Sequence, residues 1–147
     1  MDIYLQKGRE VLNSQAFSRM MEAELDTLSP GKAEMSLNIK YDYKQSYGFV
    51  HGGVISYMAD NCLTFAGATY LGNCVTSEFK INYLFPAIGE RLIATASVIS
   101  HTWRQAVCEC RLSVERQGQR SLVAAAQGTI VKVENDVTAS GVTESAR

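Results

Sequence analysis

The chain has 147 residues, of which 46% are apolar and 20% charged, and its formal net charge is −1 at pH 7. This length supports one domain with one hydrophobic core, and the composition is that of an ordinary globular protein. Because the charge provides no basic field, we expect neither nucleic acid nor an anionic membrane as a partner.

The N-terminal part of the chain predicts one helix and one hairpin. Residues 8–22 carry apolar side chains near helical spacing, which indicates a short amphipathic helix. Residues 23–28 and 33–39 read as two strands joined by a turn at Pro30 and Gly31.

A loop over 42–50 leads into the most apolar stretch of the chain. Residues 52–70 predict a helix that is apolar almost all round, so we expect it to be buried on most sides, with Gly72 as its stop. The stretch is a poor membrane span because it contains Asp60, Asn61 and several hydroxyl side chains.

Four strands are predicted after this helix, over 74–85, 91–101, 106–114 and 121–133, and we expect them to meander. In the first strand, strict alternation would put Val75, Ser77, Phe79, Ile81, Tyr83 and Phe85 on one face and Thr76, Glu78, Lys80 and Asn82 on the other. Residues 134–147 form a polar tail that we expect to be flexible.

These elements predict an α+β fold with a single domain over residues 1–133, in which one long central helix is wrapped by a curved antiparallel β-sheet. No signal peptide is visible, so we expect a cytoplasmic protein. Four cysteines without a C-x-x-C pair and only two histidines predict buried, inert thiols, no metal and no cofactor.

Asp60 is the candidate catalytic residue. It is the only formally charged residue between Gly52 and Ser77, and a carboxylate removed from water needs a partner, a raised pKa or a function. The same helix begins with His51-Gly52-Gly53, which leaves backbone amides and the positive end of the helix dipole unobstructed. This combination indicates acyl-transfer chemistry with an oxyanion at the helix start.

Gly52 and Asp60 are eight residues apart, hence about 12 Å along a helix axis. Both groups of one chain cannot reach one carbonyl, so two chains related by a two-fold axis would have to share each site. Thr76 or Asn82 is a candidate for holding the carboxylate or a water, with a solvated sheet face preferred for Asn82. His51 is either a general base or, by preference, a turn residue.

The segments YGFVHGGVISYMADNCLTFAG and VTSEFKINYLFPAIGERL resemble the hotdog-fold acyl-CoA thioesterases of the phenylacetyl-CoA (PaaI-like) branch. The resemblance extends from about Phe17 to Val133. It implies that Gly52 supplies the oxyanion amide, that Asp60 is the general base or nucleophile, and that Thr76 orients the carboxylate or the water. Gln45 stands where many members have an Asn that places the carbonyl or water, and Phe85 stands where relatives often carry an Arg.

We therefore expect an acyl-CoA thioesterase without cofactors that forms a homodimer with shared active sites and a dimer of dimers. The predicted catalytic residues are Asp60, Gly52, Gln45 and Thr76, and the predicted substrate-binding residues are His51, Gly53, Asn61 and Tyr57. Two rivals remain open: a hotdog hydratase or dehydratase, which characteristically needs a catalytic His, and a non-catalytic acyl-CoA binding module.

Overall fold

The computed structural model describes residues 2–134. The helices are α1 (Ile3–Ser14), α2 (Ala16–Met21) and α3 (Gly52–Leu71), with a short 3₁₀ helix at Tyr41–Tyr43. The strands are β1 (Glu24–Ser29), β2 (Lys32–Asn38), β3 (Cys74–Tyr83), β4 (Arg91–His101), β5 (Gln105–Arg116) and β6 (Gln119–Lys132). The predicted flexible tail lies, from residue 135 on, outside the described residues.

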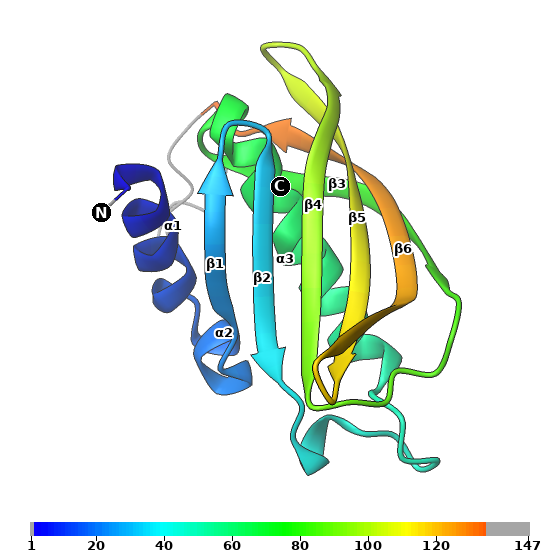
Figure 1. Cartoon of the computed structure of the whole chain (residues 1–147). Coiled ribbons are helices and arrows are strands. Elements are labelled where there is room, and N and C mark those ends of the chain that lie inside the picture. Colours follow the sequence, from blue (N-terminus) through cyan, green and yellow to red (C-terminus); the bar gives the residue numbers. More distant parts are fainter. Residues whose placement is uncertain (1, 135–147) are drawn as a thin grey trace, which may run out of the picture.

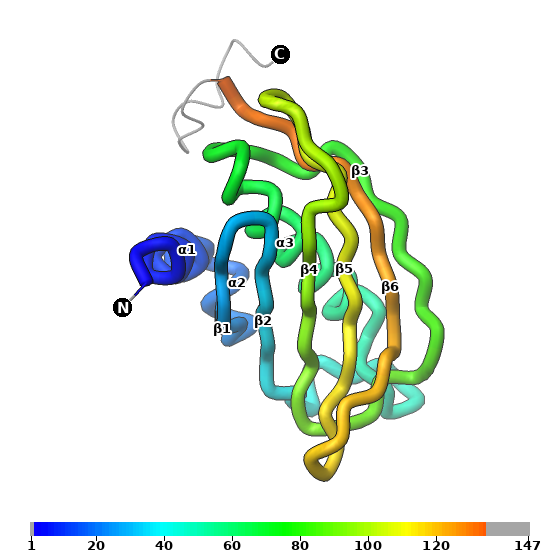
Figure 2. The backbone as a smooth tube through the Cα atoms, turned by 45° about the horizontal axis from the view of Figure 1, so that its top comes forward, coloured from blue at the N-terminus to red at the C-terminus, as the bar shows by residue number. Residues whose placement is uncertain are grey.

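All six strands form one antiparallel sheet in the order β1-β2-β4-β5-β6-β3, and this sheet curves around α3 (Figures 1 and 2). The predicted α+β architecture, the hotdog fold, is therefore confirmed. The prediction that β3 to β6 meander is wrong for β3, which pairs with β6 at the far edge of the sheet. The segment after β3 carries the chain back across the sheet, and only β4, β5 and β6 follow one another as neighbours.

Helix α3 begins and ends where the sequence predicts. His51 is its N-cap, and the His51 imidazole Nδ1 accepts a hydrogen bond of 2.8 Å from the Gly53 amide. Gly72 ends the helix with φ +73°, a conformation that a residue with a side chain rarely adopts. Capping at both ends explains why a run rich in Gly, Thr and β-branched residues forms a regular helix.

Only part of the surface of α3 is buried in the single chain, which is less than the predicted burial on most sides. The buried residues face the sheet and are Ile55, Met58, Ala59, Cys62, Leu63, Phe65, Ala66, Gly67 and Leu71. We call the remaining side, which the sheet leaves uncovered, the open face; it carries Gly53, Ser56, Tyr57, Asp60, Asn61 and Thr64, none of them in the buried class.

A β-bulge in β3 reverses the predicted alternation of that strand. The pairing of β3 with β6 shifts between Thr76 and Glu78, which leaves Ser77 as an extra residue. Thr76 therefore faces α3, on the same side as Phe79 and Ile81, which pack against the core. Val75, which strict alternation would place on that side, is 47% exposed.

The N-terminal helix is longer than predicted and is broken. Helix α1 begins at Ile3, where the Asp2 carboxylate caps it by accepting from the Tyr4 amide at 2.9 Å. It ends at Ser14, and the extended backbone of Gln15 separates it from α2. Both helices lie beside the β1 edge (Figure 1), and Gly8 permits the close approach because a Cβ there would lie 2.6 Å from the Leu25 side chain.

Candidate active site

Asp60 lies on the open face of α3 and is held by a hydroxyl from the sheet. The Thr76 hydroxyl donates a hydrogen bond of 2.6 Å to Asp60 Oδ1. The Thr64 hydroxyl lies 3.0 Å from the Thr76 hydroxyl and donates to the Asp60 carbonyl at 2.8 Å. The bulge in β3 makes this hydrogen bond possible, because it turns the Thr76 side chain toward the Asp60 carboxylate. The second oxygen of Asp60 accepts no hydrogen bond within residues 2–134.

Tyr57 and Asn61 flank Asp60 but bond to the N-terminal helices. The Tyr57 hydroxyl donates to Ser18 at 2.6 Å, and the Asn61 amide nitrogen lies 3.2 Å from both Gln15 Oε1 and the Tyr57 hydroxyl. Ser18, which is 2% exposed, donates to Gln15 at 2.6 Å. This network ties α2 and the break at Gln15 to the open face, and sequence reasoning missed both Gln15 and Ser18.

At the start of α3 the two glycine amides differ. The Gly53 amide already donates to His51, whereas the Gly52 amide donates to no acceptor within the described part of the chain. The Gly52 carbonyl accepts from the Tyr83 hydroxyl at 3.1 Å, and Tyr83 also shares a short hydrogen bond with Ser56. Gly52 is thus the donor at this helix end that remains available to a ligand.

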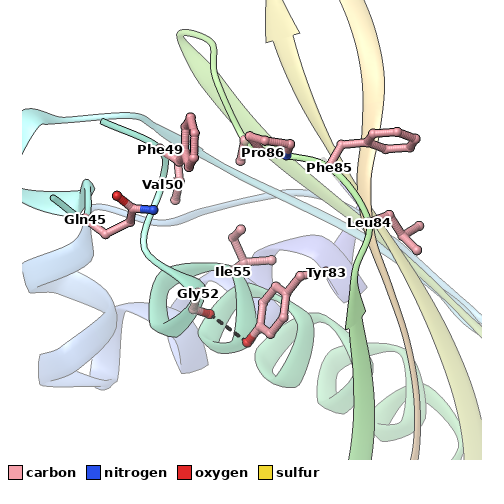
Figure 3. Close-up of a pocket in the computed structure, with 10 residues that line it drawn as sticks. Gln45, Phe49, Val50, Gly52, Ile55, Tyr83, Leu84, Phe85 and Pro86 are labelled. Atoms are coloured by element: carbon pink, nitrogen blue, oxygen red, sulfur yellow. Dashed lines mark hydrogen bonds between the residues drawn. The ribbon is translucent and has the colours of Figure 1, made fainter. Parts of the chain in front are cut away.

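A pocket of about 290 Å³ opens beside Gly52. Gln45 and Tyr83 lie on opposite sides of Gly52, and Leu84 and Phe85 point away from it (Figure 3). The Gln45 side-chain oxygen accepts from the Tyr47 amide, and the Gln45 backbone is fixed by a 2.8 Å bond to Phe49. The sequence placed Tyr83 on the core face and did not identify it as a neighbour of Gly52.

Gly52 and Asp60 lie in different hollows of one chain. Gly52 and Gln45 line the pocket just described, whereas Asp60, Asn61, Tyr57 and Gly53 line a groove of about 420 Å³ on the open face, bounded by Phe17 of α2. Gly52 and Asp60 are eight residues apart, which corresponds to about 12 Å of helix. One chain therefore does not bring the candidate oxyanion donor and the candidate base together.

The other histidine is remote from this site. His101 stacks on Tyr70, with ring centroids 4.0 Å apart, near the opposite end of α3 from Gly52. Tyr70 is ten residues beyond Asp60, about 15 Å along the helix. Among the hydrogen bonds of residues 2–134, none joins either histidine to the Asp60 carboxylate.

The four cysteines are free thiols, three of them buried. Burial raises the pKa of Cys74 and of Cys108 to about 11, and it raises the pKa of Cys62 well above its ordinary value. These thiols are protonated at neutral pH and are poor nucleophiles. In the described part of the chain, no group of three His, Cys, Asp or Glu residues is arranged to hold a metal ion. No helix among residues 2–134 is long and apolar enough to cross a membrane.

Comparison with known proteins finds similarity in sequence and fold over most of the chain. The sequence profile of the Thioesterase superfamily matches residues 47–121. A thioesterase family protein from Silicibacter pomeroyi is 30% identical, with coverage of 87% of this chain and 96% of that chain and a TM-score of 0.81. Human acyl-coenzyme A thioesterase 13 is 28% identical over 106 residues, which are 64% of this chain and 73% of that protein.

The E. coli PaaI protein, from the phenylacetic acid degradation operon, superposes with a TM-score of 0.82 over 92% of this chain and 96% of its own. Its sequence identity is 20%, so this likeness concerns the fold.

Proposed function

The chain belongs to the thioesterase superfamily and is a thioester hydrolase, and we propose that its substrate is an acyl-CoA. The observation that carries the mechanism is the Asp60 carboxylate, which Thr76 holds at 2.6 Å on the uncovered side of α3. The likeness to acyl-coenzyme A thioesterase 13 supports CoA as the leaving group.

In the proposed reaction, water attacks the thioester carbonyl carbon while Asp60 takes a proton from the water. The carbonyl oxygen becomes an oxyanion that accepts from the Gly52 amide at the positive end of α3. The tetrahedral intermediate then collapses, the C–S bond breaks, and the CoA thiolate receives the proton that Asp60 took from the water, which regenerates the carboxylate. In the alternative, an Asp60 oxygen attacks the carbonyl carbon, CoA leaves, and water hydrolyses the resulting anhydride.

We propose that two chains build each site. Because Gly52 and Asp60 of one chain line separate hollows, the Gly52 amide of one chain would act with Asp60 of its partner. A two-fold axis that sets two open faces against each other would produce two equivalent sites. Assembly as a dimer of dimers and a cytoplasmic location are further proposals, and the four free thiols support a reducing compartment.

The two rivals are less well supported. A hydratase of this fold would need a histidine at the reacting atoms, but His51 Nδ1 is occupied by the Gly53 amide and His101 stacks on Tyr70. A binding module without catalysis would not release CoA. Steady release of free thiol from an acyl-CoA, measured with a thiol reagent, therefore separates the proposed function from both rivals.

The shared site is tested by mixing two inactive variants. Gly52→Pro removes the amide hydrogen at the first position of the helix, where proline is tolerated, and Asp60→Asn removes the base. Gly52→Ala is the matched control, since it adds a Cβ 3.3 Å from the Tyr83 ring but keeps the amide hydrogen.

Random exchange places half the dimers in the mixed state, and each mixed dimer has one intact site of two. Mixing Gly52→Pro with Asp60→Asn should therefore restore about a quarter of wild-type activity. A mixture with demonstrated exchange that stays inactive would exclude the shared site without excluding thioester hydrolysis.

A further inference from the structure

We infer that the acyl group of the substrate binds in the pocket between α1 and α3. This inference rests on the proposed acyl-CoA hydrolysis and assigns the part of the molecule that selects the acyl group. The pocket has a volume of about 400 Å³, within the range of ligand sites. Its apolar lining includes Tyr4, Val11, Leu28, Phe65 and Ala68.

The pocket adjoins the groove that holds Asp60. Gln15 and Asn61 line both hollows, so the hydrogen bond between them, 3.2 Å long, marks the boundary. Thr64 also lines the pocket, and its hydroxyl lies 3.0 Å from the Thr76 hydroxyl that bonds Asp60. An acyl group whose carbonyl carbon lies at Asp60 therefore meets the entrance of this pocket with its first carbons.

The shape and chemistry of the pocket favour a hydrocarbon chain. From Asn61 to Gly72 the pocket follows α3 for eleven residues, about 16 Å of helix axis. Lys7 is the one charged residue among its lining residues. An elongated apolar cavity of this length fits a straight acyl chain of medium length, whereas an acetyl group would leave most of it empty.

The wall that α1 contributes is fixed in place before substrate arrives. Arg9 donates to the Leu25 carbonyl at 3.0 Å, and Ser18 joins Gln15 to Tyr57 of α3. Residues 3–21 lie outside the matched superfamily region, 47–121. The α1 wall of the pocket would thus belong to a segment outside the matched region, whereas the α3 wall lies inside it.

The pocket beside Gly52 is the competing place for the acyl chain, because it also has apolar walls, among them Phe49 and Ile55. Substitutions that narrow one pocket at a time distinguish the two. Ala68→Met and Val11→Trp would narrow the pocket under α1, and Phe49→Trp would narrow the pocket beside Gly52. Ile3→Trp is the matched control on α1, since Ile3 is 62% exposed and does not line the pocket.

The measurement is kcat/KM for acetyl-, hexanoyl-, decanoyl- and palmitoyl-CoA with each variant in the full chain. We expect Ala68→Met and Val11→Trp to lower kcat/KM for decanoyl-CoA by at least about tenfold relative to acetyl-CoA, the scale of a filled hydrophobic subsite. Ile3→Trp and Phe49→Trp should leave the ratio of the two within about twofold of the wild type.

Binding of the product decanoate, measured by calorimetry, supplies a readout that does not depend on turnover. It should weaken in Ala68→Met and stay unchanged in Ile3→Trp. An unchanged chain-length profile in both narrowing variants, or a profile altered by Phe49→Trp instead, would overturn the inference. If the wild type hydrolyses none of the four acyl-CoAs but still binds decanoate in an Ala68-dependent way, the proposed function fails while the pocket stands.

Discussion

The two faces of α3 differ in what their side chains contact. The face toward the sheet carries Met58, Ala59, Cys62 and Leu63, each with no measurable exposure. The open face carries hydroxyl, amide and carboxylate groups. Tyr57, Asn61 and Asp60 on this face form hydrogen bonds with residues outside α3. One helix thus serves as the core of the domain and carries the candidate site, and the two sets of residues lie at different positions around its axis.

This separation teaches that stability and catalysis should respond to different substitutions in the same element. The outer face of the sheet offers an internal reference, because Thr129 donates to the Glu78 carboxylate at 2.7 Å there. That pair repeats the chemistry of Thr76 and Asp60 on the opposite face of the sheet. Variants of the two pairs can therefore be compared directly.

The largest expected effect is on the open face. Asp60→Asn should lower kcat by about 10²–10⁴-fold, because the amide keeps the volume and accepts from Thr76 but cannot take a proton. Its urea unfolding midpoint should stay close to that of the wild type. Glu78→Gln is the control and should leave kcat unchanged; near-wild-type turnover by folded Asp60→Asn would contradict the mechanism.

The next effect belongs to the packed face. Leu63 is fully buried against the sheet, so Leu63→Ala should lower the free energy of unfolding by about 2–5 kcal/mol through lost contacts and a cavity. Activity per folded molecule should remain within about threefold of the wild type. A large loss of kcat in protein shown to be folded would mean that the two faces are coupled rather than separate.

Removal of the supporting hydroxyl should have an intermediate effect on rate. Thr76→Val deletes a hydrogen bond to a carboxylate, a bond worth about 1.5–3 kcal/mol, so kcat should fall by roughly 10–100-fold with KM little changed. Thr129→Val removes the matching bond on the outer face and should leave kcat alone. Equal effects of the two variants would show that Thr76 acts through stability only.

The smallest effect concerns alkaline stability. Cys74 lines the pocket under α1, and burial raises the pKa of its thiol from 9.0 to about 11. Between these values the unfolded chain loses the proton first, so the free energy of unfolding should fall as pH rises from about 9 to 11 and level off above. Cys74→Ala should make this decline shallower, as measured by urea unfolding at several pH values. An identical decline in the variant would mean that Cys74 does not titrate in this way.

The sequence predicted helices and strands well where capping or turn residues mark their ends. The boundaries of α3 follow from His51 and Gly72, and the hairpin of β1 and β2 follows from Pro30 and Gly31. The break between α1 and α2 was missed because Gln15 is neither Gly nor Pro and has no strong breaking tendency. The pairing of β3 with β6 depends on contacts about fifty residues apart, which periodicity cannot reveal.

The geometry of the candidate site was predicted in part. The distance between Gly52 and Asp60 follows from helix geometry alone, and the structure puts them in separate hollows. The prediction placed Thr76 on the same face of the strand as Glu78. The extra residue at Ser77 puts the two side chains on opposite faces instead. One signal existed elsewhere in the sequence: Gly128 lies inside β6, and a glycine within a strand often marks a bulge or a close approach. The bonds from Gln15 and Ser18 to α3 are tertiary and had no counterpart in the sequence pattern.

The bulge at Ser77 also sets a condition on any attempt to transplant this site. A Cβ at Gly128 would lie 2.5 Å from the Phe79 Cβ and 2.6 Å from the Glu78 carbonyl oxygen. A scaffold that keeps the bulge must therefore keep the glycine as well. Straightening the bulge while Ser77 is kept and the rest of β3 stays in register would pair Ser77 with Ile130 and turn Thr76 to the outer surface of the sheet. A scaffold built with an ideal strand here would therefore display every residue of the site in the right order and still lack the hydroxyl that holds the carboxylate.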